Sequence, residues 1–103
     1  MIISGGLNVY PREVEQVLDK LQVVAESAVI GVPHPDFGEG VIAVIVPQPG
    51  QSPAEEAVIA SVRAKLADFK TPKRVFFTEQ LPRNAMGKVR KNALRKQYNG
   101  VLS

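Results

Sequence analysis

The pattern of apolar and polar positions along the chain predicts alternating strands and helices. Residues 1–4, MIIS, predict a short strand that enters a Gly5-Gly6 turn. Pro11 suits the first position of a helix, where its missing N–H costs nothing. The apolar residues that follow have helical spacing, at Val14, Val17, Leu18 and Leu21. The chain is therefore expected to open with a strand, a glycine turn and an amphipathic helix.

Two apolar runs follow in the middle of the chain. Residues 27–33, SAVIGVP, and 41–47, VIAVIVP, are rich in β-branched residues and predict two buried strands that neighbour each other in one sheet. The HPDFGEG segment between them, residues 34–40, has the Pro, Asp and Gly that are typical of a turn. His34 lies in this turn between two prolines, which favours a turn residue over a catalytic base or a metal ligand.

The second half of the chain predicts a helix, a strand and a helix. Residues 52–55, Ser-Pro-Ala-Glu, match a capping box with proline at the first helical position. Residues 74–78, RVFFT, predict a strand, residues 81–88 a loop, and residues 91–98 a terminal helix that ends at Asn99-Gly100. We expect an α+β fold, with two or three helices on one face of a small sheet, in one domain spanning residues 1–103. The apolar face of the first of these two helices is expected at Val58, Ile59, Val62, Leu66 and Phe69.

Composition narrows the class of protein. The chain has 103 residues, of which 45% are hydrophobic and 22% charged, as is usual for a globular domain. It contains no cysteine, which excludes disulfides and thiolate metal sites and agrees with a cytoplasmic location. No apolar run approaches the length of about 20 residues that spans a bilayer, and the first residues lack the features of a signal peptide. We therefore expect no membrane partner.

Charge is distributed unevenly along the chain. Residues 1–69 hold four basic and nine acidic residues, whereas residues 70–103 hold nine basic residues and one acid. This asymmetry predicts an anionic partner, which could be a nucleic acid, a phosphorylated small molecule or an acidic protein surface. A solvated basic helix without a partner is the alternative. Phe76, Phe77 and Tyr98 could stack on bases, but no known nucleic-acid-binding motif accompanies them.

Two short segments are candidates for chemistry. In PRNAMGKV, residues 82–89, Gly87 gives the backbone freedom and Lys88 offers an ammonium group with three donors for phosphate or carboxylate oxygens. The segment is not a P-loop, because it lacks the first glycine and the hydroxyl residue after the lysine. Ser4-Gly5-Gly6 is the second candidate, since paired glycines let a ligand approach the backbone closely. A solvated lysine and a plain turn are the alternatives.

Four segments together resemble the adenylate-forming enzymes, which include the acyl-CoA synthetases, the adenylation domains of nonribosomal peptide synthetases, and luciferase. Residues 4–15, SGGLNVYPREVE, resemble the segment after the hinge of these enzymes. Residues 26–46, 66–77 and 81–95 resemble the later motifs in the same order. The resemblance covers essentially the whole chain and identifies it as the small C-terminal domain, without the large N-terminal domain. The residues that match the first motif are Gly6, Val9, Pro11, Glu13, Val14 and Glu15, and those that match the last are Pro82, Gly87 and Lys88.

The resemblance implies two roles for such a domain. Lys88 bridges the carboxylate and ATP in the adenylation step. After a large rotation of the domain, Ser4, Gly5 and Gly6 help to form the tunnel for the pantetheine arm of CoA. The missing N-terminal domain holds Mg²⁺ and most contacts to ATP, so the chain alone is expected to be inactive. Basic side chains near the CoA phosphates are expected at Lys70, Lys73 and Arg74.

The family resemblance also implies regulation at the same lysine. Lys88 is expected to be acetylated by a protein lysine acetyltransferase and restored by a deacetylase, with Lys91 as a nearby decoy. A recognition surface for the acetyltransferase is expected at Arg90, Lys91, Arg95 and Lys96. Within the family, residues 4–15, 33–41 and 82–89 are most similar to malonyl-CoA synthetases. Asn-Ala-Met at residues 84–86 replaces the common Thr-x-Ser/Thr. Malonate is therefore the expected acid substrate, and no nucleic acid is expected to bind.

Overall fold

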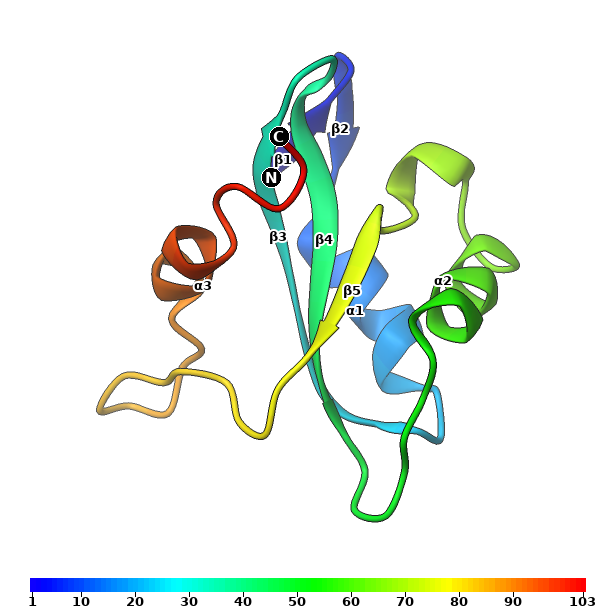
Figure 1. Ribbon diagram of the computed structural model, residues 1–103, viewed down its shortest axis with the longest axis vertical. Helices are drawn as coiled ribbons and strands as arrows, with labels where there is room; N and C mark the ends of the chain where they lie inside the picture. Colours follow the sequence, from blue (N-terminus) through cyan, green and yellow to red (C-terminus); the bar gives the residue numbers. More distant parts are fainter.

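The computed structural model describes residues 1–103 as one sheet with helices packed against it (Figure 1). The elements are β1 (Ile2–Ser4), β2 (Leu7–Val9), α1 (Pro11–Asp19), β3 (Val24–His34), β4 (Gly38–Pro47), α2 (Glu55–Arg63), the 3₁₀ turn η1 (Asp68–Lys70), β5 (Arg74–Phe77) and α3 (Lys91–Gln97). This composition confirms the predicted α+β class. No helix is long and apolar enough to cross a membrane.

A long hairpin of β3 and β4 forms the centre of the sheet. The two strands pair antiparallel from Val24 opposite Pro47 to His34 opposite Gly38, as predicted for these apolar runs. On its other edge β4 pairs first with β1, where Ser4 faces Gly38, and further along with β5, which runs parallel to it. β2 completes the sheet beyond β1. β3 therefore lies at one edge, and β1 and β5 share the opposite edge of β4.

Two of the three helices lie on one face of the sheet, within the prediction of two or three, and the third lies on the opposite face. Figure 1 shows α1 and α2 on one side of the central hairpin and α3 on the other. Alternate residues of the hairpin fill two separate apolar clusters, with Val29 and Ile45 facing α1 and α2, and Ile30 and Ile42 facing α3. The reason is visible in the sequence, because continuous apolar strands are typical of a sheet that is buried on both faces.

Two local predictions need correction. Residues 7–9 form the strand β2, although the sequence pattern predicts no strand there. Gly5 and Gly6 have φ of +58° and +82°, as expected for a two-residue hairpin turn, and they allow β2 to fold back on β1.

The expected capping box at residues 52–55 does not form. The chain is still extended at Ala54, and α2 begins only at Glu55 and ends at Arg63, so Leu66 and Phe69, expected on its apolar face, lie beyond its end.

The first helix and the histidine turn follow prediction. α1 begins at Pro11, and its apolar face buries Val14 and Leu18. Nδ1 of His34 accepts hydrogen bonds from the backbone N–H of Asp36 at 3.0 Å and of Phe37 at 3.2 Å. The His34 ring also stacks on that of Phe37. His34 thus serves the turn, as the sequence indicated.

Candidate functional site

Lys88 lies on a small hairpin between β5 and α3. Arg83 and Val89 form an isolated antiparallel bridge, and the N–H of Asn84 donates to the Lys88 carbonyl at 2.9 Å. The N–H of Arg90 donates to the Pro82 carbonyl at 2.8 Å. These bonds close residues 82–90, hereafter the lysine hairpin, so Lys88 lies on a braced segment instead of a loose loop.

Asn84 and Gly87 shape the tip of the lysine hairpin. The Asn84 side-chain oxygen accepts hydrogen bonds from the backbone N–H of Met86 at 2.9 Å and of Lys88 at 3.0 Å. Gly87 has a φ of +82°, a conformation that only glycine adopts without strain. Asn84 therefore makes an asparagine turn, and it orders the backbone at Lys88 directly.

A groove of about 810 Å³ runs between the lysine hairpin and the start of α1. Its lining includes Arg12, Lys88 and Arg90, which take part in none of the ion pairs of the structure. The Lys88 side chain is exposed and makes no hydrogen bond. The groove is also lined by the carboxylates of Glu15, which pairs with Lys91, and Asp19, which accepts the Ser27 hydroxyl, so the three unpaired cations are the charges that remain for an anionic ligand.

The cations predicted to form one recognition surface have different environments. Lys91 forms an ion pair with Glu15 at 2.8 Å, and the Glu15 side chain is only 14% exposed. Arg95 donates to the side chain of Asn92. Arg90 and Lys96 are exposed and unpaired. Glu15 also accepts the Val29 N–H at 2.9 Å, so the pair ties α3 to α1 and to the edge strand β3.

A second hollow, of about 220 Å³, lies beside the β1–β2 turn. Ser4 and Gly5 line it, together with Leu7, Phe37, Asp68, Phe69 and Lys73. The structure thus brings two of the three predicted residues to a common hollow, whereas Gly6 lies at the exposed tip of the turn and outside the lining. No sequence pattern assigns Phe37 or Phe69 to this hollow, because Phe37 lies within the turn motif and Phe69 is expected on the apolar face of a helix.

The predicted neighbours of a CoA phosphate differ in availability. The ammonium of Lys70 pairs with Glu13 at 3.0 Å, and Arg74 pairs with Glu55 at 2.7 Å. Lys73 has no ion pair, and its Nζ lies 4.8 Å from the centre of the Phe37 ring at the edge of the hollow. Lys73 is therefore the cation of this group that remains free for an anionic ligand.

The two candidate sites occupy different parts of the molecule. The β1–β2 turn lies at one end of the molecule beside the β3–β4 turn, whereas the connection from β5 to α3 swings out on the other side, beside α3 (Figure 1). No residue lines both the groove and the hollow. The groove and the hollow are therefore separate sites on this domain.

Aromatic residues of the basic segment are used inside the fold. The rings of Phe76 and Tyr98 stack on each other with their centres 4.8 Å apart, and both pack against the apolar cluster under α3. Burial raises the pKa of the Tyr98 hydroxyl. Two of the three aromatic residues that could have stacked on bases thus serve the core instead.

The residues present fit some of the expected ligands. The unpaired cations of the groove suit the phosphates of ATP, and the small hollow with Lys73 at its edge suits the pantetheine arm and a phosphate of CoA. No group of three or more His, Asp or Glu side chains is arranged to hold a metal ion.

Comparison with known proteins identifies the family. The model of the AMP-binding enzyme C-terminal domain matches residues 13–88. The chain is 54% identical over 97 residues, 94% of its length, to the 3-[(3aS,4S,7aS)-7a-methyl-1,5-dioxo-octahydro-1H-inden-4-yl]propanoyl:CoA ligase of Rhodococcus jostii, and covers 19% of that protein. It is 45% identical, over its whole length, to the 4-chlorobenzoate–CoA ligase of a Pseudomonas species, and covers 20% of it.

A solved structure gives the same result. The fold superposes on MatB from Rhodopseudomonas palustris with a TM-score of 0.95 and 52% identity, over 98% of this chain and 20% of that one. The chain thus spans about a fifth of the length of the relatives it matches. It belongs to the family of AMP-binding enzyme C-terminal domains, whose members here are parts of CoA ligases.

Proposed function

We propose that this chain is the mobile C-terminal domain of an ATP-dependent acyl-CoA synthetase and that Lys88 acts in its adenylation step. The proposal rests on the exposure of the Lys88 side chain and on its lack of an ion pair. Its ammonium group is exposed and unpaired on a braced hairpin, beside a groove with two further unpaired cations. A large N-terminal domain supplies the rest of the active site, including Mg²⁺ and most contacts to ATP.

In the first half-reaction a carboxylate oxygen of the acid attacks the α-phosphorus of ATP. The new oxygen–phosphorus bond gives an acyl-adenylate, and pyrophosphate leaves. Both reactants are anions, and charge builds up on the phosphate oxygens in the transition state. Lys88 donates hydrogen bonds to carboxylate and phosphate oxygens, which reduces the repulsion between the reactants and stabilises that charge.

In the second half-reaction the domain rotates and presents the β1–β2 turn. Ser4, Gly5 and Gly6 form one wall of the tunnel through which pantetheine reaches the adenylate. The CoA thiolate attacks the acyl carbon, and AMP leaves. Lys73, the unpaired cation beside the hollow, contacts a phosphate of CoA.

Malonate is the proposed acid, on the strength of the motifs at residues 4–15, 33–41 and 82–89. Relatives of similar identity carry the names of very different acids, which is consistent with selection of the acid by the large domain. Steady-state assays of the complete enzyme with malonate, methylmalonate, acetate and 4-chlorobenzoate test this assignment. A higher kcat/KM for any other acid than for malonate would contradict it.

Acetylation of Lys88 is the proposed means of control. The amine nitrogen attacks the thioester of acetyl-CoA, the carbon–sulfur bond breaks, and CoA leaves with the proton lost by the amine. Lys88 is favoured over Lys91 because the latter is held by Glu15 at 2.8 Å. Mass spectrometry after treatment with a protein lysine acetyltransferase should find Lys88 modified first, and a deacetylase should reverse the change. Equal modification of Lys91 and Lys88 would refute the preference.

The main proposal is tested with Lys88→Ala in the complete enzyme. The two half-reactions are assayed separately, as adenylate formation from ATP and acid, and as thioester formation from supplied acyl-adenylate and CoA. We expect adenylate formation to fall by roughly a hundredfold or more while thioester formation stays within about twofold. Retention of adenylate formation would show that the lysine hairpin is not the catalytic element.

A further inference from the structure

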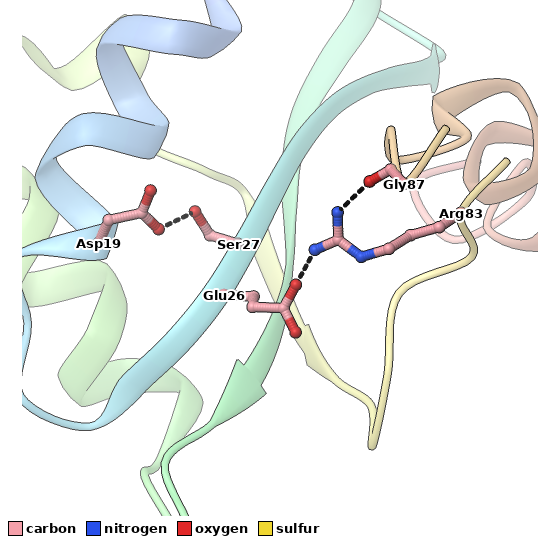
Figure 2. Close-up of polar contacts among 5 residues, drawn as sticks. All are labelled: Asp19, Glu26, Ser27, Arg83 and Gly87. Atoms are coloured by element: carbon pink, nitrogen blue, oxygen red, sulfur yellow. Dashed lines mark hydrogen bonds and ion pairs between the residues drawn. The ribbon is translucent and has the colours of Figure 1, made fainter. Parts of the chain in front are cut away.

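Arg83 joins the two arms of the lysine hairpin to the sheet. One terminal nitrogen of its guanidinium donates to the Gly87 carbonyl at 2.6 Å, and the other pairs with the carboxylate of Glu26 on β3 (Figure 2). The Gly87 carbonyl belongs to the peptide bond that leads into Lys88. A planar guanidinium with both ends engaged is a rigid connector, so Arg83 relates the Lys88 backbone to the sheet.

A β-bulge directs Glu26 toward the lysine hairpin. The pairing of β3 with β4 shifts register between Val24 and Glu26. Val24 packs in the cluster under α1 and α2, and in a regular strand Glu26 would face the same side. After the bulge Ala28 faces α3 instead. Bulges commonly re-aim a side chain in this way beside functional sites.

After the bulge, the side chains of the neighbouring residues Glu26 and Ser27 lie on opposite faces of β3. The Ser27 hydroxyl donates to Asp19 of α1 at 2.6 Å on one face of β3, whereas Glu26 reaches Arg83 on the other (Figure 2). The side chains of Glu26 and Arg83 are 39% and 43% exposed. Ion pairs this open to solvent add little to folding stability, so this one is a poor candidate for a purely structural role.

We propose that Glu26 is a positioning residue for Lys88, acting through Arg83 and the Gly87 carbonyl. Glu26 itself touches no reacting atom. It fixes the direction in which the lysine hairpin leaves the sheet, and with it the point that the Lys88 ammonium reaches in the active site. Small displacements of a group that acts in a transition state reduce the rate strongly. The inference rests on the proposed role of Lys88.

The test uses Glu26→Ala and Glu26→Gln in the complete enzyme, with Lys88→Ala as reference. Glu56→Ala is the matched control, because Glu56 is an exposed acid on α2 without an ion pair. We expect Glu26→Ala to lower kcat of adenylation about tenfold with little change in the KM for ATP, and to leave thioester formation and Tm unchanged. Glu26→Gln keeps an acceptor oxygen but loses the charge, and should show a smaller decrease. Glu56→Ala should resemble the wild type.

A second readout needs no activity. In the 103-residue chain, ¹⁵N relaxation should show the order parameter of the Lys88 amide falling from a rigid value near about 0.85 toward about 0.6 in Glu26→Ala. Full adenylation by Glu26→Ala beside a deficient Lys88→Ala would overturn this inference alone. Equal loss of both half-reactions with a lower Tm would also overturn it, in favour of a structural role. An active Lys88→Ala would overturn the proposed function and this inference with it.

Discussion

The lysine hairpin and the β1–β2 turn present two different kinds of surface on one small sheet. The first is a charged arm, held to β3 by the ion pair of Arg83 with Glu26 and followed by α3, which the Lys91–Glu15 pair ties to α1, and the Lys88 ammonium is left free. The second is a glycine turn beside a small hollow with aromatic walls. An arm suits a group that must reach into an active site, whereas a turn without side chains suits a wall along which a slender substrate passes. This contrast supports the proposal that one domain serves both half-reactions.

Loss of charge at Lys88 should produce the largest effect. Lys88→Gln is neutral and, like acetyl-lysine, ends in a polar amide. We expect it to lower the rate of adenylation roughly a hundredfold, because the transition-state charge loses its ionic partner. Quenched-flow assays of adenylate formation measure the change. Lys88→Arg, which keeps a cation, is the control and should retain more activity than Lys88→Gln.

The ion pair at Glu15 should matter more for stability than the one at Glu13. Glu15→Ala leaves the Val29 N–H at the sheet edge and the Lys91 ammonium without partners, at a cost of about 2 kcal/mol in the free energy of unfolding. Glu13→Ala removes an exposed pair with Lys70 and should cost less than about 1 kcal/mol. Urea denaturation compares the two variants. Equal losses in the free energy of unfolding would mean that the contacts of Glu15 with Lys91 and Val29 stabilise the fold no more than the pair of Glu13 with Lys70.

Substitution in the glycine turn should affect the other half-reaction. Gly5→Val places a branched side chain next to the Phe37 ring, at a φ of +58° that costs about 1–2 kcal/mol. We expect thioester formation to fall about tenfold, with adenylation within about twofold of wild type. Gly50→Val is the matched control, since Gly50 also has positive φ, of +79°, but lies in the turn after β4. A similar loss in Gly50→Val would trace the effect to general destabilisation.

A small, pH-dependent effect is expected at Glu55, which belongs to neither site. A hydrogen bond from the Val75 N–H, and then one from Arg74, lowers the pKa of the Glu55 carboxyl below its usual 4.5. The carboxylate therefore stabilises the fold above the unfolded pKa, and this contribution is lost as pH falls through the lower, folded pKa. Glu55→Gln should lose about 1 kcal/mol at pH 7 and less near pH 3. Thermal denaturation at both pH values tests this, and a loss independent of pH would contradict it.

Prediction from sequence succeeded where one pattern determined the outcome. The helical spacing after Pro11 and the apolar runs of β3 and β4 indicated those elements correctly, and the glycine–lysine motif located an exposed Lys88. The capping box failed because the Glu55 carboxylate binds β5, a contact between residues 20 positions apart. The expectation of two or three helices on one face holds for α1 and α2, whereas α3 covers the opposite face, since the adjacent residues Val29 and Ile30 of β3 pack in different clusters.

Sequence patterns could not predict the contact between Arg83 of the lysine hairpin and Glu26 of β3. Glu26 and Arg83 are 57 residues apart, and their contact depends on a bulge that reverses the facing of β3 at Glu26. No periodicity reveals a bulge of one residue in advance. The hollow beside Gly5 was partly predictable, since the glycine pair was evident, but Phe37 and Lys73 join it only through the turn of the central hairpin and the position of β5.

The most direct test of the proposal that the lysine hairpin and the β1–β2 turn serve different half-reactions is to measure both half-reactions in the Lys88→Ala and Gly5→Val variants of the complete enzyme. If the two sites serve different steps, Lys88→Ala should lose adenylation and keep most of its thioester formation. Gly5→Val should lose thioester formation and keep most of its adenylation. Parallel losses of both half-reactions in the two variants would contradict the proposal, because they would mean that the lysine hairpin and the β1–β2 turn serve a single site.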